Sequence, residues 1–440
     1  MPSPHIAIIG SGFTGTLVAI NLLTQSTDPI TISLIDGRGT FGPGLAYSPP
    51  SETFKLNVKA QAMGALPSDP EGFFRWLKKK RPASAPDDFA PRSLYGEYLA
   101  ELLDLTVKAH PHHSVHRVSA EATDIEISSD SHDTIITLNN GTNIQANHCV
   151  LAVGNLLKTD LNGCVESSIL RAPFDAVSYT TLSSAQRICV IGSSLTAVDV
   201  ILEAERQGFK GKYLVISRRG RFPLPHETSN GTQASLPKDW HTLGSASKIL
   251  SLIRTESRRL GSSQPVFEAM RPNIQSMWRH LPRQERQRFL RHAQPIWDIH
   301  RHRIPQSHHD TLQELQRAGR LELIAAKVAE VTNVEGRTRI CFIPRTARNT
   351  TASRDVDALF LCAGPEGDIS KTKSSLLQNL TRKGLIHKGS LSLGIAGSIP
   401  EISVIGPLQR ENLWEITAVR ELREEAARIA SHALKSLRGA

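Results

Sequence analysis

Three glycines near the start of the sequence have the spacing of a loop that binds dinucleotides. They follow the apolar residues 6–9, and residues 16–24 after them have helical apolar spacing. Gly10 permits a tight turn, Gly12 lets the backbone approach a pyrophosphate, and Gly15 allows helix and strand to pack closely. The N–H groups at the start of the helix would then face the negative charge. The loop residues expected to contact the dinucleotide are Gly10, Gly12, Phe13, Thr14 and Gly15.

A carboxylate stands where such a loop needs one for an adenosine. Residues 30–35 read as a second apolar strand, and Asp36 follows it, 21 residues after Gly15. An acid at this place accepts hydrogen bonds from the ribose. Glycine spacing alone is weak evidence, because it also occurs in ordinary flexible turns. Here strand, loop, helix, strand and acid occur in order within 36 residues, which favours a bound dinucleotide.

A second, less complete loop begins at Gly192. Apolar residues 188–191 precede it, a helix is expected from Leu195 to about Gln207, and residues 212–217 read as a strand. Two arginines follow this strand, where an NAD site would have an acid, and arginine there pairs with a 2′-phosphate. The alternative is that both arginines are solvated on a turn. The pattern predicts NADPH rather than NADH, bound by Gly192, Ser193, Ser194, Leu195, Thr196, Ser217, Arg218 and Arg219.

A basic segment supplies the candidate substrate contacts. The net charge is +10, and residues 271–303 hold eight arginines against Glu285 and Asp298. Guanidinium groups bind carboxylates and planar anions through two hydrogen bonds. The alternative is that these arginines form a solvated basic surface and bind no ligand. No nucleic-acid-binding pattern accompanies the aromatic residues there. We therefore expect a small anionic substrate and no nucleic acid, with Arg291, His300, Arg301 and Arg303 as candidate contacts.

Other features exclude several classes of protein. The cysteines at 149, 164, 189, 341 and 362 include no Cys-x-x-Cys pair, so neither a metal site nor a redox disulfide is expected. No apolar stretch approaches the length of a membrane span. Residues 6–9 are too short an apolar run for a secretory signal. A cytoplasmic location is the default expectation.

The order of these signals predicts an α/β fold with two Rossmann-like dinucleotide-binding domains, the second inserted in the first. We expect an FAD-binding domain over residues 1–184 and 356–440. An NADPH-binding domain would occupy residues 185–355 and carry a helical insert at 245–318. Apolar and polar residues alternate over 115–153, which predicts antiparallel strands there. A single long helix is expected from Trp414 onward.

Several stretches resemble bacterial flavoproteins with paired FAD- and NAD(P)-binding domains. The resemblance keeps its order along nearly the whole chain. That group includes aspartate N-monooxygenases that form nitrosuccinate and proposed FAD-dependent urate hydroxylases; lysine and ornithine N-hydroxylases and flavin-containing monooxygenases are similar at greater distance. The stretches are residues 41–47, 56–58 with Met63, 73–77, 92–98, 300–303, and 406–408 running to 413–415.

The resemblance implies FAD beside residues 42–47 and 56–58, with Gly406 and the start of the final helix facing the flavin. A helix N-terminus there would favour the anionic reduced flavin. Pro43 and Glu411 depart from the family pattern, which commonly has arginine and glycine at these two places. The further residues expected to line FAD are Gly42, Gly44, Tyr47, Asn57, Met63, Gly154, Gly364, Gly406 and Trp414.

The resemblance also implies a monooxygenase that consumes NADPH and molecular oxygen, with N-hydroxylation of an acidic amino acid such as aspartate favoured. Ring hydroxylation of a urate-like substrate and simple NADPH:acceptor reduction stay open. The sequence contains no Phe-x-Gly-x-x-x-His-x-x-x-Trp stretch, so a Baeyer–Villiger enzyme is not supported. A flavin-binding sensor without turnover is the alternative from another class, and Arg218 with Arg219 argues against it, because a sensor needs no 2′-phosphate site.

Overall fold

The computed structural model describes residues 3–158, 160–161, 169–227, 231, 233–334, 336–347 and 349–438. The chain divides into two compact units. Unit 1 consists of Met1–Pro49, Val58–Leu156 and Glu366–Ala440, and unit 2 of Pro50–Asn57 and Leu157–Pro365. The second unit is therefore inserted in the first along the chain.

The boundaries between the units differ from those expected at 184/185 and 355/356. The units divide after Leu156 and after Pro365. The reason is that β9 (Leu170–Arg171) and β15 (Ala358–Leu361) pair with each other in the sheet of unit 2. Residues 50–57 also belong to unit 2, because Phe54 is fully buried in its core.

Unit 1 is built on a five-stranded sheet in the order β19-β7-β1-β2-β3, and every pair in it is parallel. Strands β1, β2, β7 and β19 are buried on both faces, as the continuous apolar runs predict, whereas the edge strand β3 is largely exposed. The expected antiparallel excursion at 115–153 is partly wrong, because β3 is a parallel edge strand of this sheet and only β4, β5 and β6 form an antiparallel sheet. The bounds are β1 His5–Ile9, β2 Thr31–Ile35, β3 Ser114–Val118, β4 Ala122–Ile127, β5 Thr134–Leu138, β6 Asn143–Ala146, β7 His148–Leu151 and β19 Ile402–Val404.

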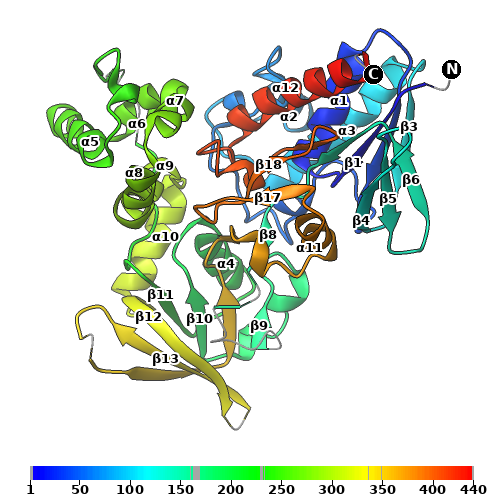
Figure 1. Ribbon diagram of the computed structural model, residues 1–440. Coiled ribbons are helices and arrows are strands. Elements are labelled where there is room, and N and C mark those ends of the chain that lie inside the picture. The colour runs from blue at the N-terminus through cyan, green and yellow to red at the C-terminus, as the bar shows by residue number, and fades with distance from the viewer. Residues whose placement is uncertain are drawn as a thin grey trace. The chain divides into compact units, whose positions relative to one another are not determined.

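The first helix of unit 1, α1, is buried along nearly its whole length and packs against α12 and α3 (Figure 1). The final helix begins at Val419, so the expected start at Trp414 is wrong. Residues 414–417 form turns, since Glu415 has φ +66°, outside the right-handed helical region. The bounds are α1 Phe13–Gln25, α2 Gly72–Lys80, α3 Arg92–Ala109, α11 Ser375–Arg382, β17 Ile386–Lys388, β18 Ile395–Ser398 and α12 Val419–Arg438.

Unit 2 is built on a seven-stranded sheet in the order β14-β13-β12-β11-β10-β15-β9. The strands from β9 to β12 pair in parallel, and β13 and β14 continue the sheet as antiparallel strands (Figure 1). The arrangement β15-β10-β11 in this sheet repeats β7-β1-β2 of unit 1. The bounds are β10 Arg187–Ile191, α4 Leu195–Arg206, β11 Lys212–Ser217, β12 Leu321–Val334, β13 Arg337–Pro344 and β14 Ala352–Val356. Where the chain passes between the units, β8 (Leu156–Leu157) and β16 (Pro365–Glu366) form a two-stranded sheet.

Between β11 and β12 lies the helical insert, in agreement with the helical spacing of residues 245–318. Its core includes large aromatic side chains, with Trp278, Phe289 and Trp297 fully or almost fully buried. One turn, Phe289–Ala293, is π-helical. The bounds are α5 Ala246–Leu260, α6 Gln264–Met270, α7 Ile274–His280, α8 Arg283–Arg288, α9 Gln294–Arg301 and α10 Gln306–Arg317. Among the helices of the described ranges, none is long and apolar enough to cross a membrane.

Candidate dinucleotide-binding sites

The glycines of the first loop are required by its geometry. Gly10 has φ +98°, and a Cβ added to it would lie 2.3 Å from the carbonyl oxygen of Ala152. A Cβ on Gly15 would lie 1.9 Å from the carbonyl oxygen of Gly10. The Gly10 N–H donates to the carbonyl of Ile35, at 2.8 Å. The loop therefore bridges β1, β2 and β7 at the carboxyl ends of these parallel strands, where α/β sheets bind ligands.

The segment at 42–44 lies against this loop. The Gly42 N–H donates to the carbonyl of Ser11, at 2.9 Å. A Cβ on Gly44 would lie 2.6 Å from the Cα of Gly12, so Gly44 must be glycine for this close approach. Pro43 is accommodated because α3 has Gly96 opposite it, where a Cβ would lie 2.7 Å from the Cβ of Pro43.

Helix α1 begins without a cap from the protein. Its N-cap is Gly12, with no side-chain cap hydrogen bond, and its first turn contains no acidic residue. The first N–H groups of a helix have no partner within it, and together with the helix dipole they favour an anion. This geometry fits a pyrophosphate beside Phe13 and Thr14.

Asp36 is held at the same loop by the backbone. One carboxylate oxygen accepts the N–H of Ser11 at 3.2 Å, and the other accepts the N–H of Arg38 at 2.9 Å. The side chain of Asp36 is 7 % exposed. Each carboxylate oxygen has a second lone pair, so Asp36 keeps acceptor capacity for ribose hydroxyls.

The segment that begins at Gly406 lies at the start of α1. A Cβ on Gly406 would lie 3.6 Å from Cγ2 of Thr14. The Gly406 N–H donates to the side chain of Gln409, which donates in turn to Glu425 of α12 at 2.8 Å. The final helix thus supports this segment through Gln409, although the helix itself starts later than expected.

Two other residues predicted near the flavin are buried in unit 1. Met63 and Trp414 are both about fully buried, and the guanidinium of Arg410 lies 4.9 Å from the centroid of the Trp414 ring. Glu411, which departs from the family pattern, has a structural role here. Its carboxylate accepts the N–H of Leu391 at 3.0 Å and lies 3.3 Å from the hydroxyl of Ser390.

Aromatic residues pack against Phe13, at the start of α1. The Tyr47 ring packs edge-on against Tyr95, at 4.7 Å between centroids, and against Phe13 at 5.8 Å. Burial raises the pKa of Tyr47 to about 12 and raises the pKa of Tyr95 well above its ordinary value. Both phenols are therefore neutral at any physiological pH.

The second loop repeats the geometry of the first. Gly192 has φ +112°, its N–H donates to Ile216 at 2.8 Å, and a Cβ on it would lie 2.1 Å from the carbonyl of Cys362. Helix α4 has Ser194 as N-cap with no side-chain cap hydrogen bond, and its first turn has no acidic residue. Leu195 and Thr196 begin this helix. The second loop can therefore receive a pyrophosphate in the same way.

Gly154 and Gly364 occupy equivalent places after β7 and β15, with φ of +72° and +81°. Gly154 follows the strand beside the first loop, as expected. Gly364 lies in unit 2, because β15 pairs with β10 there and Gly364 follows β15, and its expected contact with FAD stays a prediction. Asn57 is also in unit 2, and its carbonyl oxygen lies 2.9 Å from Nε2 of His226.

The residues after β11 form a polar cluster around Ser193. Its hydroxyl lies 2.9 Å from Oγ of Ser217 and 2.6 Å from the carbonyl oxygen of Arg221. Arg218 and Arg219 are exposed, and Nη2 of Arg219 donates to the carbonyl of residue 291 at 3.3 Å. The structure brings these residues together at the second loop, as the sequence predicts. The position of Arg221 in the same cluster was not predicted, because the motif ends at residue 219.

The four candidate substrate residues lie at two places along the chain: Arg291 on the π-helical turn, and the other three at the end of α9 or just after it. Arg291 is exposed on the π-helical turn, and Arg301 is half-buried at the end of α9. Nδ1 of His300 lies 2.7 Å from Oγ of Ser263, and burial, with the nearby Arg303 cation, lowers the pKa of His300. Its ring stacks on Phe267, at 5.7 Å between centroids.

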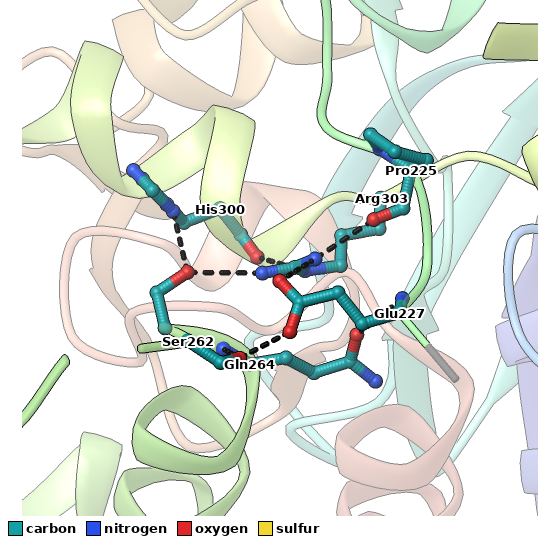
Figure 2. A network of polar contacts seen from close by, with 7 residues as sticks. Pro225, Glu227, Ser262, Gln264, His300 and Arg303 are labelled. Carbon is teal, nitrogen blue, oxygen red and sulfur yellow. Dashed lines mark hydrogen bonds and ion pairs between the residues drawn. The ribbon is translucent and has the colours of Figure 1, made fainter. Parts of the chain in front are cut away.

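Arg303 is a structural residue, which contradicts its expected contact with substrate. Its side chain is 3 % exposed and donates to the carbonyls of Pro225 and His300 and to Glu227 (Figure 2). It donates also to the hydroxyl of Ser263, at 2.9 Å. A guanidinium enclosed by these acceptors has no face left for a ligand.

The cysteines give no redox centre among the described residues. Cys149, Cys189 and Cys362 are buried free thiols, and burial raises the pKa of each well above its ordinary value. Cys341 is a free thiol as well, and Cys164 lies outside the described residues. No group of His, Cys, Asp and Glu in the described part of the chain is arranged to hold a metal ion.

Two dinucleotide loops of one geometry, one followed by an acid and the other by arginines, define a protein that binds two dinucleotides. In agreement, residues 7–156 match the model of a family described as FAD-NAD(P)-binding. No curated protein sequence matches this chain.

Solved structures confirm the expected α/β fold and the resemblance to amino-acid N-hydroxylases. The ornithine N-hydroxylase of Kutzneria sp. 744, solved with reduced FAD, NADP+ and L-ornithine, is 14 % identical with a TM-score of 0.67, over 99 % of this chain and 100 % of the other. L-lysine 6-monooxygenase from Pseudomonas syringae is 16 % identical, with a TM-score of 0.63 over 99 % of each chain. Thioredoxin reductase from Lactococcus lactis is 13 % identical, with a TM-score of 0.53 over the whole of both chains. At these identities the likeness establishes the fold.

Proposed function

We propose that this protein is an FAD-dependent monooxygenase that consumes NADPH and molecular oxygen and N-hydroxylates a small acidic amino acid. The observation that carries the proposal is the pair of equivalent loops with opposite charges after their second strands. Asp36 follows β2, and Arg218 with Arg219 follows β11. The acid suits an adenosine ribose and the arginines suit a 2′-phosphate, so the first loop takes FAD and the second takes NADPH.

The residues present fit both groups. Unit 1 would hold the FAD pyrophosphate on the first turn of α1 and the ribose on Asp36, with the 42–44 and 406 segments around it. Unit 2 would hold the NADPH pyrophosphate on the first turn of α4. When bound, FAD would accept a hydride from NADPH and supply the reactivity towards oxygen. The protein binds and orients the two cofactors and the substrate.

The cysteines favour a monooxygenase over a disulfide reductase, although thioredoxin reductase shares the fold. A disulfide reductase needs two neighbouring cysteines that alternate between thiol and disulfide. The sequence has no Cys-x-x-Cys pair, and the described cysteines that are buried have raised thiol pKa values. Raised pKa values leave little thiolate, which is the form that reacts.

The acidic substrate is supported by the charge of the chain. The protein carries a net charge of +10, and residues 271–303 are rich in arginine. The loss of Arg303 from the candidate contacts leaves Arg291, His300 and Arg301 as proposed contacts. The N-hydroxylases of the same fold act on ornithine and lysine, so the choice between acidic and basic amino acids is open to direct measurement.

The test is a comparison of substrates with purified, FAD-loaded protein. NADPH oxidation, oxygen uptake, hydroxylamine product and released hydrogen peroxide are measured with aspartate, glutamate, ornithine, lysine and urate. We expect aspartate or glutamate to yield hydroxylamine with little peroxide. Hydroxylated urate as the product would support ring hydroxylation instead. Bound flavin without NADPH oxidation under any condition would contradict the enzyme and favour a sensor.

A further inference from the structure

The chain from Ser217 to Glu227, here called the connecting segment, joins the second glycine loop to the helical insert. Its first residues are fixed by the loop, because the Ser193 hydroxyl lies 2.9 Å from Oγ of Ser217 and 2.6 Å from the carbonyl oxygen of Arg221. The arginines proposed to recognise the 2′-phosphate lie in this first half.

The second half of the connecting segment is fixed by the helical insert. The Ile304 N–H donates to the carbonyl of Leu224 at 3.0 Å, and the His226 N–H donates to the carbonyl of Ile304 at 2.9 Å. The Leu224 N–H donates to Ile299 of α9, at 3.1 Å. Backbone pairing thus attaches the connecting segment to the residues that surround Arg303.

Arg303 fastens this attachment with its side chain (Figure 2). Nη1 donates to the carbonyl of Pro225 at 2.7 Å and to Glu227 at 2.9 Å, both in the connecting segment. Nε donates to the carbonyl of His300 at 3.1 Å, and Nη2 donates to Ser263 at 2.9 Å, both in the insert. One guanidinium therefore joins the connecting segment to α9 and to the start of α6.

Only arginine can make these contacts together. Its planar fork offers five donors in fixed directions, whereas a lysine ammonium is a single point with three donors. Burial of a charge is costly unless the charge is paired and hydrogen-bonded, and Glu227 supplies the pairing at 2.9 Å. A chain that needed only stability here could use apolar residues of similar size.

The connecting segment presents three arginines next to the second loop: Arg218, Arg219 and Arg221 are all exposed. The insert reaches this half as well, because Arg219 donates to the carbonyl of residue 291 in the π-helical turn. A binding segment held in one conformation loses less conformational freedom when its ligand binds. Fixing both ends of the connecting segment therefore favours binding through the arginines between them.

We propose that Arg303 is a positioning residue for cofactor selectivity: it holds the connecting segment so that Arg218, Arg219 and Arg221 meet the 2′-phosphate of NADPH together. The inference rests on the proposed NADPH site and adds to it Arg221 as a third recognition residue. Selectivity for NADPH over NADH then depends on a buried residue of the helical insert that does not contact the nucleotide.

The experiment uses the full-length, FAD-loaded protein and compares wild type with Arg303→Lys. The dissociation constants of NADP+ and NAD+ are measured by calorimetry, and KM and kcat are measured with NADPH and NADH. We expect Arg303→Lys to weaken NADP+ binding about ten-fold and NAD+ binding less than two-fold. The KM for NADPH should rise more than kcat falls. Loss of stability alone would not change the ratio of the two affinities.

Two more variants complete the design. Ser263→Ala removes the acceptor of Nη2 and the partner of His300 Nδ1 but keeps the other contacts of Arg303. It is a smaller change than Arg303→Lys and should shift the same ratio in the same direction by about two- to five-fold. Arg254→Lys is the matched control, since Arg254 is exposed on α5 of the same insert. It should leave both affinities unchanged. If Arg303→Lys does not fold, the ratio of NADP+ to NAD+ affinity in Ser263→Ala decides whether Arg303 has a positioning role.

The outcomes separate this inference from the proposed function. If wild-type protein binds NADP+ no more tightly than NAD+, the proposed NADPH site itself fails. If wild type prefers NADP+ and both Arg303→Lys and Ser263→Ala keep the same preference, only the positioning role of Arg303 is overturned. A selective loss of NADP+ affinity in the variants supports it.

Discussion

Asp36 directly follows β2 and Arg218 directly follows β11, the second strand of the glycine-loop motif in each unit. The charge at this place decides which ribose each loop can bind. Asp36 is fixed by two backbone N–H groups, whereas Arg218 is exposed. A carboxylate repels a 2′-phosphate and an arginine attracts it. At the scale of single residues, the two loops are therefore distinguished by one side chain each.

The arginines after β11 give a direct prediction. The double variant Arg218→Ala/Arg219→Ala should raise the KM for NADPH by about ten- to a hundred-fold, which corresponds to the loss of one charge-assisted hydrogen bond of about 1.5–3 kcal/mol in total. The KM for NADH should change less than two-fold. Steady-state kinetics with both cofactors measures this, with Arg254→Ala as a control. An unchanged preference would show that the arginines are merely solvated.

Substitution of Gly10 should be more harmful than substitution of another glycine with positive φ. Gly10→Ala would put a Cβ 2.3 Å from the Ala152 carbonyl, whereas Gly141 has φ +83° with no atom within 4 Å of an added Cβ. Gly141→Ala should therefore cost only the backbone strain, about 1 kcal/mol. Flavin content per chain and thermal unfolding should both fall for Gly10→Ala and little for Gly141→Ala. Equal losses in the two variants would contradict this reading.

At the scale of elements, apolar runs before the glycines predict β1 and β10, because buried parallel strands are apolar on both faces. The start of the final helix was not predictable in this way. Apolar spacing continues back to Ile416, yet residues 414–417 form turns, with Glu415 in the left-handed region, and α12 begins only at Val419. Burial of Arg303 was equally hidden, since its partners Pro225 and Ser263 are distant in sequence. The composition of residues 271–303 shows that they are basic, but it does not show which distant residues surround each arginine.

A buried histidine at the start of β7 gives an element-scale prediction. Burial, with the nearby His432, lowers the pKa of His148 to about 4, and Nε2 lies 2.9 Å from Oγ of Ser403 in β19. The unfolded chain binds this proton first as pH falls, near pH 6.5. The stability is therefore full above pH 6.5 and decreases between pH 6.5 and 4, by up to about 3 kcal/mol from this group.

Urea unfolding at several pH values between 7.5 and 4.5 tests this. His148→Asn should be less stable at pH 7.5 and lose less stability on acidification than wild type. Burial also lowers the pKa of His5 and His113, which adds to the acid loss of both proteins alike. His387→Asn is the control, because His387 is exposed on β17. Parallel pH profiles for wild type and His148→Asn would contradict the assignment.

At the scale of the whole molecule, each unit has its own sheet, core and glycine loop. The insertion of one unit in the other follows from the order of the motifs. The boundaries between the units do not follow from this order. They depend on pairing between strands distant in sequence, such as β9 with β15, and on the burial of Phe54. Sequence periodicity describes neighbours along the chain and leaves such pairings undetermined.

This division predicts that the two cofactor sites can be lost separately. Asp36→Ala should reduce the flavin retained through purification and leave the dissociation constant of NADP+ within about two-fold. The double arginine variant should show the opposite pattern. Absorbance of the flavin and calorimetry with NADP+ measure the two quantities on the same preparations. Joint loss in either variant would show that the sites depend on each other.

The uncapped starts of α1 and α4 have a thermodynamic consequence. A bound pyrophosphate would accept hydrogen bonds from amide groups that no side chain caps, so cofactor binding and folding would share free energy. A ligand that binds only the folded state stabilises it by about 2.7 kcal/mol at a hundred times its dissociation constant. In a cell that lacks riboflavin, the supply of flavin would then limit how much of this protein survives, before it limits how fast the protein works.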